Sequence, residues 1–324
     1  MTVQITEVSY QLTEPIITAR GIISDRTGYH IEVEEDGHIG EGECMPLPGY
    51  SKISHQEAKA QLITATSRES DNSELSNEVQ AGLGLSAWNL KANQMGTPLW
   101  SLLGGSVDSI QVNSLVAGGT ESELIKSLKV SRQQGITTFK VKMGFDEDLE
   151  RIRTLSQNVK SSERIRLDPN GVWSFDKAIN RIEFAKKELG ERLQYVEDPV
   201  RDLHQLIMLR SNIDFPVATD DLTRNPDDLE LAIQNDLAEY VVLKPSLIGG
   251  IDQTISVSNH LAEKGIHAVL SSTYDGPVGL RAWCELAASI SPGISHGLGT
   301  AMYIHDDQMR SLIPENGIIT LDFS

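Results

Sequence analysis

From residue 111 onward, short apolar runs alternate with longer amphipathic segments, and this alternation constrains the fold most. Eight apolar runs occur within residues 111–299, namely QVNSLVA, TTFKVK, IRLD, QYVE, VATD, YVVLK, HAVLSS and ISHGLG. Strands that alternate with helices pair in parallel, and eight such units are typical of a closed barrel. The pattern therefore predicts an α/β fold with a modified, TIM-like (β/α) barrel. An open doubly wound sheet is the alternative, but no G-x-G-x-x-G motif follows the first strand.

The beginning of the chain has a different pattern. Short alternating runs predict strands at residues 3–12, 29–35 and 38–43, and helical spacing predicts helices at 54–67 and 73–94. The segment GTPLWSLLGG is a plausible linker, and ITLDF near the end predicts a strand that returns to the first domain. We therefore expect an α+β capping domain at residues 1–104, joined by 304–324, and a catalytic barrel at 105–303.

Composition excludes several classes of function. The chain has 28 Lys and Arg against 46 Asp and Glu, a net charge of −18, which repels nucleic acid and anionic membranes. It contains no apolar run long enough to span a bilayer, and its start lacks the organisation of a signal peptide. Cys44 and Cys284 are too few for a disulfide framework. We expect a globular cytoplasmic protein with neither nucleic acid nor membrane as a partner.

Charged residues close five consecutive apolar runs. They are Lys142, Asp168, Glu197, Asp220 and Lys244, at intervals of 26, 29, 23 and 24 positions. One such residue per strand–helix unit lands on the rim at the carboxyl ends of the strands, where barrel enzymes keep their chemistry. A single strand-end Asp or Lys is usually solvated or caps a helix. An order of lysine, three acids and lysine, in step with the structural repeat, favours a functional site over chance.

The chemistry of these side chains indicates a metal-assisted reaction. Three converging carboxylates repel one another unless a divalent cation neutralises them, and an all-oxygen set favours Mg²⁺, with Mn²⁺ also possible. Two lysines facing each other across that ion suit removal of a proton next to a carboxylate. The partner is therefore predicted to be a small-molecule carboxylate substrate. Lys140 lies two residues before Lys142, so both side chains should point inward.

The motifs at these strand ends resemble those of the enolase superfamily. The K-x-K of FKVKMG, together with LDPN, VEDP, ATDD and LKP, is similar to the muconate-lactonizing-like subgroup. Within it, the segments GEGECMPLPGYS, RLDPNGVWS, VVLKPSLIGG, SSTYDGPVGL and SHGLGT most resemble the o-succinylbenzoate synthase family. The resemblance runs over nearly the whole chain.

This resemblance implies roles for the five charged residues. Asp168, Glu197 and Asp220 would bind Mg²⁺, Lys142 would take the proton and return it to the departing hydroxide, and Lys244 would stay cationic. The implied reaction is dehydration of 2-succinyl-6-hydroxy-2,4-cyclohexadiene-1-carboxylate to o-succinylbenzoate, in the menaquinone pathway. An enediolate would form on the way.

The resemblance also implies supporting residues around the ion. Lys140 would contact substrate and, with Arg166, support the base and the carboxylates, while Asn170 and Asp221 would be their neighbours. Asp221 stands where Glu is usual, and Asp198 stands where Glu or Gln is commoner. Each side chain is therefore one methylene shorter than expected.

Residues at the last two strands are further candidates for substrate binding. The backbone N–H groups of Ser271, Ser272 and Thr273 could hold a carboxylate, or these residues could simply cap the next helix. Gly297 could let substrate approach closely, or it could form a plain turn. His296 beside it has no second histidine partner, so we expect a structural role.

The polar run at residues 21–28, GIISDRTG, is flanked by glycines and suggests a loop over the rim. Arg26 within this run could meet an anionic substrate, although a solvated loop charge is the preferred interpretation. The pair Asp275–Gly276 replaces a Glu–Ser often found in the family, which bears on the substrate more than on the chemistry.

Two other functions use the same residues. In an N-acylamino acid racemase or dipeptide epimerase both lysines would act in turn, but ISHGLGT lacks the Asp-x-Asp typical of epimerases. A non-catalytic acidic barrel that only binds an ion leaves two inward lysines, costly to desolvate, without a purpose. The sequence leaves the oligomeric state open.

Overall fold

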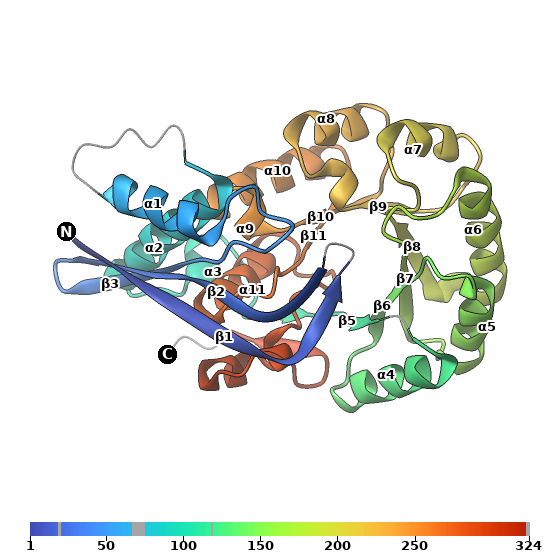
Figure 1. The fold of residues 1–324 in the computed structure, drawn as a ribbon, viewed down its shortest axis with the longest axis horizontal. Coiled ribbons are helices and arrows are strands. Elements are labelled where there is room, and N and C mark those ends of the chain that lie inside the picture. Colours follow the sequence, from blue (N-terminus) through green and yellow to red (C-terminus); the bar gives the residue numbers. More distant parts are fainter. Residues whose placement is uncertain (19–20, 67–74, 118, 322–324) are drawn as a thin grey trace.

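The computed structural model describes residues 1–18, 21–66, 75–117 and 119–321. Outside it lie the predicted helix ends at residues 67 and 73–74 and the last three residues of the predicted segment 304–324. The fold is α/β, with a mainly antiparallel N-terminal part beside a parallel barrel (Figure 1). This agrees with the predicted fold class.

The N-terminal part is a three-stranded antiparallel sheet of order β1-β2-β3 covered by helices. Its elements are β1 (Thr2–Thr18), β2 (Gly21–Glu35), β3 (His38–Cys44), α1 (His55–Thr66), α2 (Asn77–Met95) and α3 (Leu99–Leu102). The glycines of HIGEGEC explain how α2 reaches the sheet. A Cβ at Gly40 would lie 2.1 Å from the Ser86 carbonyl oxygen, and α2 lies equally close to Gly42. Only glycine permits this approach.

Residues 21–28 are part of strand β2, so the prediction of a loop at these residues is wrong, and only their place over the rim stays a prediction. β2 pairs with β1 from Thr2 to Gln11, and again from Ile16 to Thr18 after a register shift. The polar residues at exposed positions gave this segment the composition of a loop. Within it, however, Ile23 and Arg26 are buried, which a solvated loop would not achieve.

The barrel sheet is parallel, with seven strands in the order β11-β10-β9-β8-β7-β6-β5. These strands are β5 (Ser114–Val116), β6 (Thr138–Lys142), β7 (Arg164–Asp168), β8 (Leu193–Glu197), β9 (Val217–Thr219), β10 (Tyr240–Leu243) and β11 (His267–Leu270). The eighth predicted strand, ISHGLG, is reduced to isolated parallel bridges. They join His296 to Val112 and Gly297 to Ser271, which links the two edges of the sheet.

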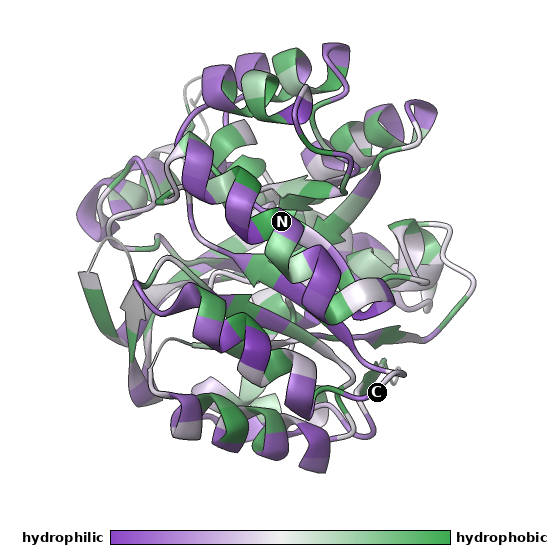
Figure 2. Ribbon diagram, turned by 90° about the vertical axis from the view of Figure 1, so that its right-hand side faces the viewer, coloured by the Kyte–Doolittle hydropathy of each residue, from purple (hydrophilic) through white to green (hydrophobic). Residues whose placement is uncertain are grey.

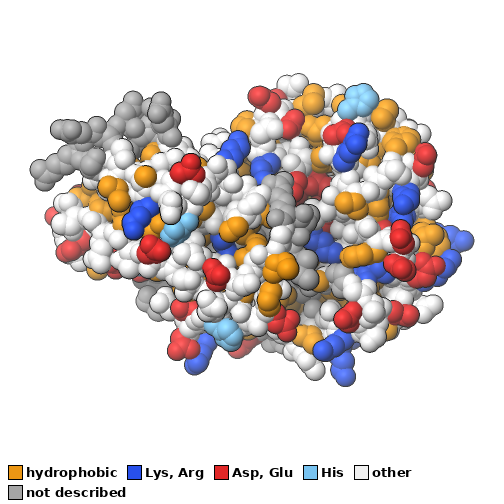
Figure 3. Space-filling view, viewed as in Figure 1, with side chains coloured by type: hydrophobic (Ala, Val, Ile, Leu, Met, Phe, Trp, Pro, Cys, Tyr) orange, Lys and Arg blue, Asp and Glu red, His pale blue; other side chains and the backbone are white. Residues whose placement is uncertain are grey.

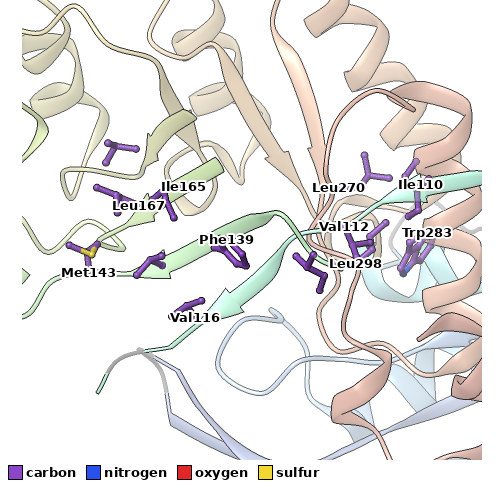
Figure 4. Packing of buried hydrophobic residues seen from close by; sticks show 14 of the residues in the cluster. Ile110, Val112, Val116, Phe139, Met143, Ile165, Leu167, Leu270, Trp283 and Leu298 are labelled. Atoms are coloured by element: carbon purple, nitrogen blue, oxygen red, sulfur yellow. The ribbon is translucent and has the colours of Figure 1, made fainter. Parts of the chain in front are cut away.

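Helices cover the outside of the barrel (Figure 1). The principal ones are α4 (Glu121–Gln133), α5 (Asp148–Asn158), α6 (Phe175–Leu189), α7 (Leu203–Arg210), α8 (Pro226–Gln234), α9 (Pro245–Ile248), α10 (Ile251–Glu263) and α11 (Pro277–Ile290). Hydrophilic and hydrophobic bands alternate along them in Figure 2, as expected for helices with one buried face. In Figure 4, Val112, Leu298 and Trp283 gather where the first and last barrel segments meet α11.

The C-terminal strand has a different partner from the predicted one. β12 (Ile318–Thr320) pairs antiparallel with β4 (Ser109–Gln111), which precedes the barrel, rather than with the three-stranded sheet. Earlier in the chain, at Ile304, an antiparallel bridge to Leu12 of β1 connects the C-terminal segment to the N-terminal sheet. The domain boundaries at residues 104 and 303 remain our proposal.

Both cysteines are buried free thiols. None of the helices in the described ranges combines the length and the apolar character that a bilayer crossing requires.

Candidate active site

Five charged side chains stand at one end of five neighbouring barrel strands. Lys142, Asp168 and Glu197 are the last residues of β6, β7 and β8, while Asp220 and Lys244 directly follow β9 and β10. Parallel pairing carries the strand ends to the same rim, and Lys142 is paired in register with Asp168. Figure 3 shows acidic and basic side chains together in a hollow near the centre of the molecule.

Lysines contact each of the three carboxylates. The Lys142 Nζ donates to Asp168 Oδ2 over 2.7 Å, and the Lys244 Nζ donates to both carboxylate oxygens of Asp220. Lys140, inward-facing as predicted, lies between the other two, with its Nζ 2.5 Å from Glu197 Oε1 and 3.0 Å from Asp168 Oδ2. The structure therefore forms a row of three carboxylates with Lys142 and Lys244 at opposite ends.

Burial and mutual repulsion perturb these groups strongly. Burial raises the pKa of Glu197 to about 7; Lys140 opposes this rise, and Asp168 and Asp220 add to it. Burial alone would lower the pKa of Lys140, but the surrounding carboxylates raise it well above its usual value. Burial would likewise raise the pKa of Asp168, but Lys140 and Lys142 hold it below its usual range. Such opposed shifts in one cluster are typical of catalytic sites.

The donor set fits a hard divalent cation. All three acids offer oxygen, and the buried Glu197 Oε2 has no hydrogen-bond partner within the described part of the chain. Their oxygens are not yet as close as a shared ion requires. Among the described residues, the acidic and histidine side chains whose ligand atoms all lie within 4.8 Å of one another are His30, Glu32 and Glu41 on the outer sheet. By the chemistry of their oxygen donors, Asp168, Glu197 and Asp220 are the residues that would hold the cation.

A fourth carboxylate, that of Asp198, holds the backbone after β9. Its two oxygens accept the N–H groups of Asp220 over 3.0 Å and Asp221 over 2.8 Å. Asp198 has a positive φ of 38°, which turns its side chain toward the neighbouring strand. Asp221 accepts a hydrogen bond from Arg224 over 2.8 Å and lies 4.0 Å from the Lys244 Nζ. The sequence named Asp198 only as a shortened neighbour, and its backbone contacts depend on strand register.

Asn170 lies next to Lys142, near the carboxylates as predicted. Its Oδ1 accepts from the Lys142 Nζ over 2.7 Å, and its backbone N–H donates to Asp168 Oδ1 over 3.0 Å. Arg166 lies two residues before the end of β7, so it is paired with Lys140 and lies deeper in the barrel than Lys142 and Asp168. Within the described ranges, its hydrogen bonds go to Gln194, Asn113 and the Ser295 carbonyl. Arg166 therefore braces the barrel interior and makes no direct contact with the three acids.

The predicted anion cradle after β11 is wrong. The N–H of Ser271 donates to the Leu243 carbonyl, that of Ser272 to the Gly297 carbonyl, and that of Thr273 to Asp275 Oδ2. These donors complete the barrel and the turn before α11, so they are occupied. Gly297 packs against the neighbouring strand, because a Cβ there would lie 2.8 Å from the Ser271 hydroxyl.

His296 and Arg26 are both buried. The structural role predicted for His296 is confirmed: its Nδ1 accepts from the Leu270 N–H, its Nε2 lies 2.9 Å from the Ser291 carbonyl, and burial lowers its pKa to about 4. Arg26 was expected to be solvated, yet it is completely buried and donates to backbone carbonyls. The burial of Arg26 could not be predicted from the sequence, because its neighbours in the chain are polar.

Comparison with known proteins shows the family. Residues 123–322 match the family described as Enolase C-terminal domain-like, and residues 3–90 match the one described as MenC, N-terminal domain. An o-succinylbenzoate synthase of Aliivibrio fischeri is 24% identical over 304 residues, covering 92% of this chain and 90% of that protein. One of Thermobifida fusca is 30% identical over 221 residues, covering 65% of this chain and 66% of that protein.

Solved structures share the fold at low identity. A dipeptide epimerase of Enterococcus faecalis, in complex with Mg and a dipeptide, aligns with a TM-score of 0.88 at 18% identity, covering 99% of this chain and 97% of that one. An N-succinyl Arg/Lys racemase of Bacillus cereus aligns with a TM-score of 0.87 at 19% identity, covering 99% and 92%. The fold and the family match over residues 123–322 together show that this chain is a member of the enolase superfamily.

Proposed function

We propose that the chain is an o-succinylbenzoate synthase, a carbon–oxygen lyase that dehydrates 2-succinyl-6-hydroxy-2,4-cyclohexadiene-1-carboxylate for menaquinone synthesis. The observation that carries the proposal is the row of three carboxylates with a lysine at each end. The MenC match at residues 3–90 and the names of the curated relatives favour this reaction over others of the superfamily.

In this proposal Lys142 acts as the base. Asn170 and Asp168 hold its Nζ at the rim, so a substrate carbon bound above them presents its proton to that nitrogen. Lys142 removes the proton next to the substrate carboxylate, leaving the electron pair on the substrate. The ring C–O bond then breaks, hydroxide leaves, and Lys142 returns its proton to give water. The product ring becomes aromatic, which makes the reaction favourable.

Lys244 acts in this proposal as a fixed positive charge. Burial would lower its pKa, but Asp220 and Asp221 raise it, so the side chain stays cationic. A preorganised charge facing the developing enediolate lowers the barrier without reorganisation. Asp168, Glu197 and Asp220 would hold Mg²⁺, which when bound supplies further positive charge beside the substrate carboxylate.

The test is turnover of the cyclohexadiene acid by the purified chain, followed by absorbance of the aromatic product, with and without Mg²⁺. Lys142→Ala should lower kcat by ~10²–10⁴-fold, the usual contribution of a positioned base, while calorimetry shows Mg²⁺ still binding. Lys126→Ala on the exposed face of α4 is the matched control and should leave kcat unchanged. Wild-type chain that makes no product with Mg²⁺ present would refute the proposal.

A racemase is the second candidate, because lysines at opposite ends of the site are also what two-sided proton transfer requires. Incubation of an N-succinyl amino acid in deuterated water distinguishes the two functions. Exchange and loss of optical rotation without dehydration would replace the synthase by the racemase. If the chain shows no turnover and no exchange, a non-catalytic binding protein is favoured.

A further inference from the structure

Arg26 joins the N-terminal sheet to the barrel through a single guanidinium. The residue lies on β2 and has no exposed surface. Its Nη2 and Nη1 donate to the Met45 and Pro46 carbonyls over 2.7 and 2.9 Å, and its Nε donates to the Tyr274 carbonyl over 3.0 Å. Met45 and Pro46 directly follow β3, whereas Tyr274 follows β11. The planar fork of arginine suits such simultaneous contacts, and lysine cannot reproduce them.

Both segments held by Arg26 border the rim. Tyr274 has a left-handed backbone with φ of 57°, and its ring lies edge-on to that of Tyr303 at 6.0 Å. Burial raises the pKa of its phenol, and the positive charge of Lys140 opposes that rise. Left-handed backbone is costly for a residue with a bulky side chain, so surrounding contacts must maintain it. The Arg26 hydrogen bond to the Tyr274 carbonyl is one such contact.

The segment from Met45 to Tyr50 reaches the rim at the loop that follows β9, two strands away from β11 in the sheet. The Tyr50 carbonyl accepts from Arg224 over 3.2 Å, and Arg224 also binds Asp221, next to the strand-end Asp220. This segment is therefore fixed by Arg26 at its start and by Arg224 at its end. Arg26 sets the distance between it and the Tyr274 segment.

The contact between the two parts of the molecule at Arg26 is close. A Cβ at Gly276 would lie 2.1 Å from Glu43 Oε1 and 2.4 Å from the Tyr10 ring. The carboxylate of Asp275, joined by that of Glu43 when it is ionised, provides the negative charge that a buried guanidinium requires. A change of Arg26 should therefore be felt at the rim rather than absorbed by loose packing.

We propose that Arg26 is a positioning residue that fixes the 45–50 segment and the 274–276 segment relative to each other, and with them the walls of the substrate pocket. Arg26 itself does not touch the strand-end lysines or acids in the described structure. The inference rests on the proposed function only in placing substrate at this rim. Loss of the guanidinium should raise KM more than it lowers kcat, because the base and the carboxylates keep their own contacts.

The test compares Arg26→Met with Arg192→Met. Arg192 is the matched control, because its guanidinium also donates to backbone carbonyls, those of Leu189, Ser156, Val159 and Glu188, away from the rim. Arg26→Met should raise KM by about tenfold or more, since misplacement of site walls by ~1 Å can cost up to ~10²-fold. Arg192→Met should lower the melting temperature with KM unchanged. In Arg26→Ala, added guanidinium chloride should partly restore KM, whereas ammonium chloride should not.

Amide hydrogen exchange gives a readout that does not depend on activity. Exchange in residues 45–51 and 273–276 should be faster in Arg26→Met and unchanged in Arg192→Met. If Arg26→Met does not fold, Arg26→Lys takes its place. Wild-type KM and wild-type exchange in the folded Arg26 variant would overturn the inference. Fast exchange at both segments in a chain whose wild type lacks dehydratase activity would support the role of Arg26 while rejecting the synthase.

Discussion

Glu43 offers a test of the structure that is independent of catalysis. This carboxyl group ends up between the N-terminal sheet and the barrel, 4% exposed, where its Oε1 accepts from the Tyr10 hydroxyl and its Oε2 from the Gly279 N–H of α11. Burial raises its pKa to about 7, despite the Gly279 hydrogen bond, and the charge of Asp275 adds to the rise. Glu43→Gln removes the titration while keeping an acceptor for Gly279 and a donor for Tyr10.

The sign of the pH effect follows from linkage. Between the ordinary pKa of 4.5 and the folded value of about 7, the folded chain holds a proton on Glu43 that the unfolded chain has released. The free energy of unfolding contributed by this group is therefore complete below pH 4.5 and falls as pH rises toward 7. At ~1.4 kcal/mol per pH unit the loss is about 3 kcal/mol. Glu43→Gln should avoid it.

The assay is urea unfolding of wild type and variant from pH 4.5 to 8. The difference in unfolding free energy should shift in favour of Glu43→Gln by about 3 kcal/mol across this range. Titrations shared by both chains, such as that of His296, cancel in this difference. Glu41→Gln is the matched control on the same strand, because a hydrogen bond with His30 lowers the pKa of Glu41; it should show no such gain. A constant difference between wild type and Glu43→Gln would show that the carboxyl group is not buried as described.

Two further predictions concern the backbone. Asp198→Asn leaves one of the Asp220 and Asp221 N–H groups without an acceptor, so we expect the unfolding free energy to fall by about 1–3 kcal/mol. Calorimetry should also show weaker Mg²⁺ binding. An unchanged Mg²⁺ affinity would argue against a role of Asp198 in holding the backbone at Asp220 and Asp221. In Gly84→Ala the added Cβ on α2 meets open space, so the unfolding free energy should rise by about 0.5–1 kcal/mol. In Gly42→Ala the added Cβ would lie 2.1 Å from a carbonyl oxygen of α2, so the melting temperature should fall sharply. Equal melting temperatures for the two variants would contradict the packing of α2 on β3.

The barrel and the row at its rim could be predicted because both follow from periodicity. A strand–helix repeat imposes parallel pairing, and parallel pairing carries every strand end to the same edge. Lys142 and Asp168 are therefore neighbours even though 26 residues separate them. The same rule placed Lys140 on the inner face. No knowledge of the loops was required.

Contacts that depend on tertiary partners could not be predicted in this way. The hydroxyl-rich run from Ser271 to Thr273 has the composition of an anion site. However, the Ser272 N–H donates to the Gly297 carbonyl of the last barrel segment, and the Thr273 N–H donates to the Asp275 side chain. Arg26 lies in a polar run typical of a loop. Its guanidinium can be buried because the carbonyls of residues 45, 46 and 274 accept its hydrogen bonds. Local composition does not reveal which backbone groups another segment will occupy.

Charge balance at the rim connects the lysines to the metal site. Three buried carboxylates need compensating charge, and the sequence indicated a divalent cation as its source. The structure supplies compensation from within, because Lys140 contacts Glu197 and Asp168 while Lys244 contacts Asp220. Lys142 and Lys244, which contact Asp168 and Asp220 at the two ends of the row, are therefore also the two lysines that the proposed reaction requires.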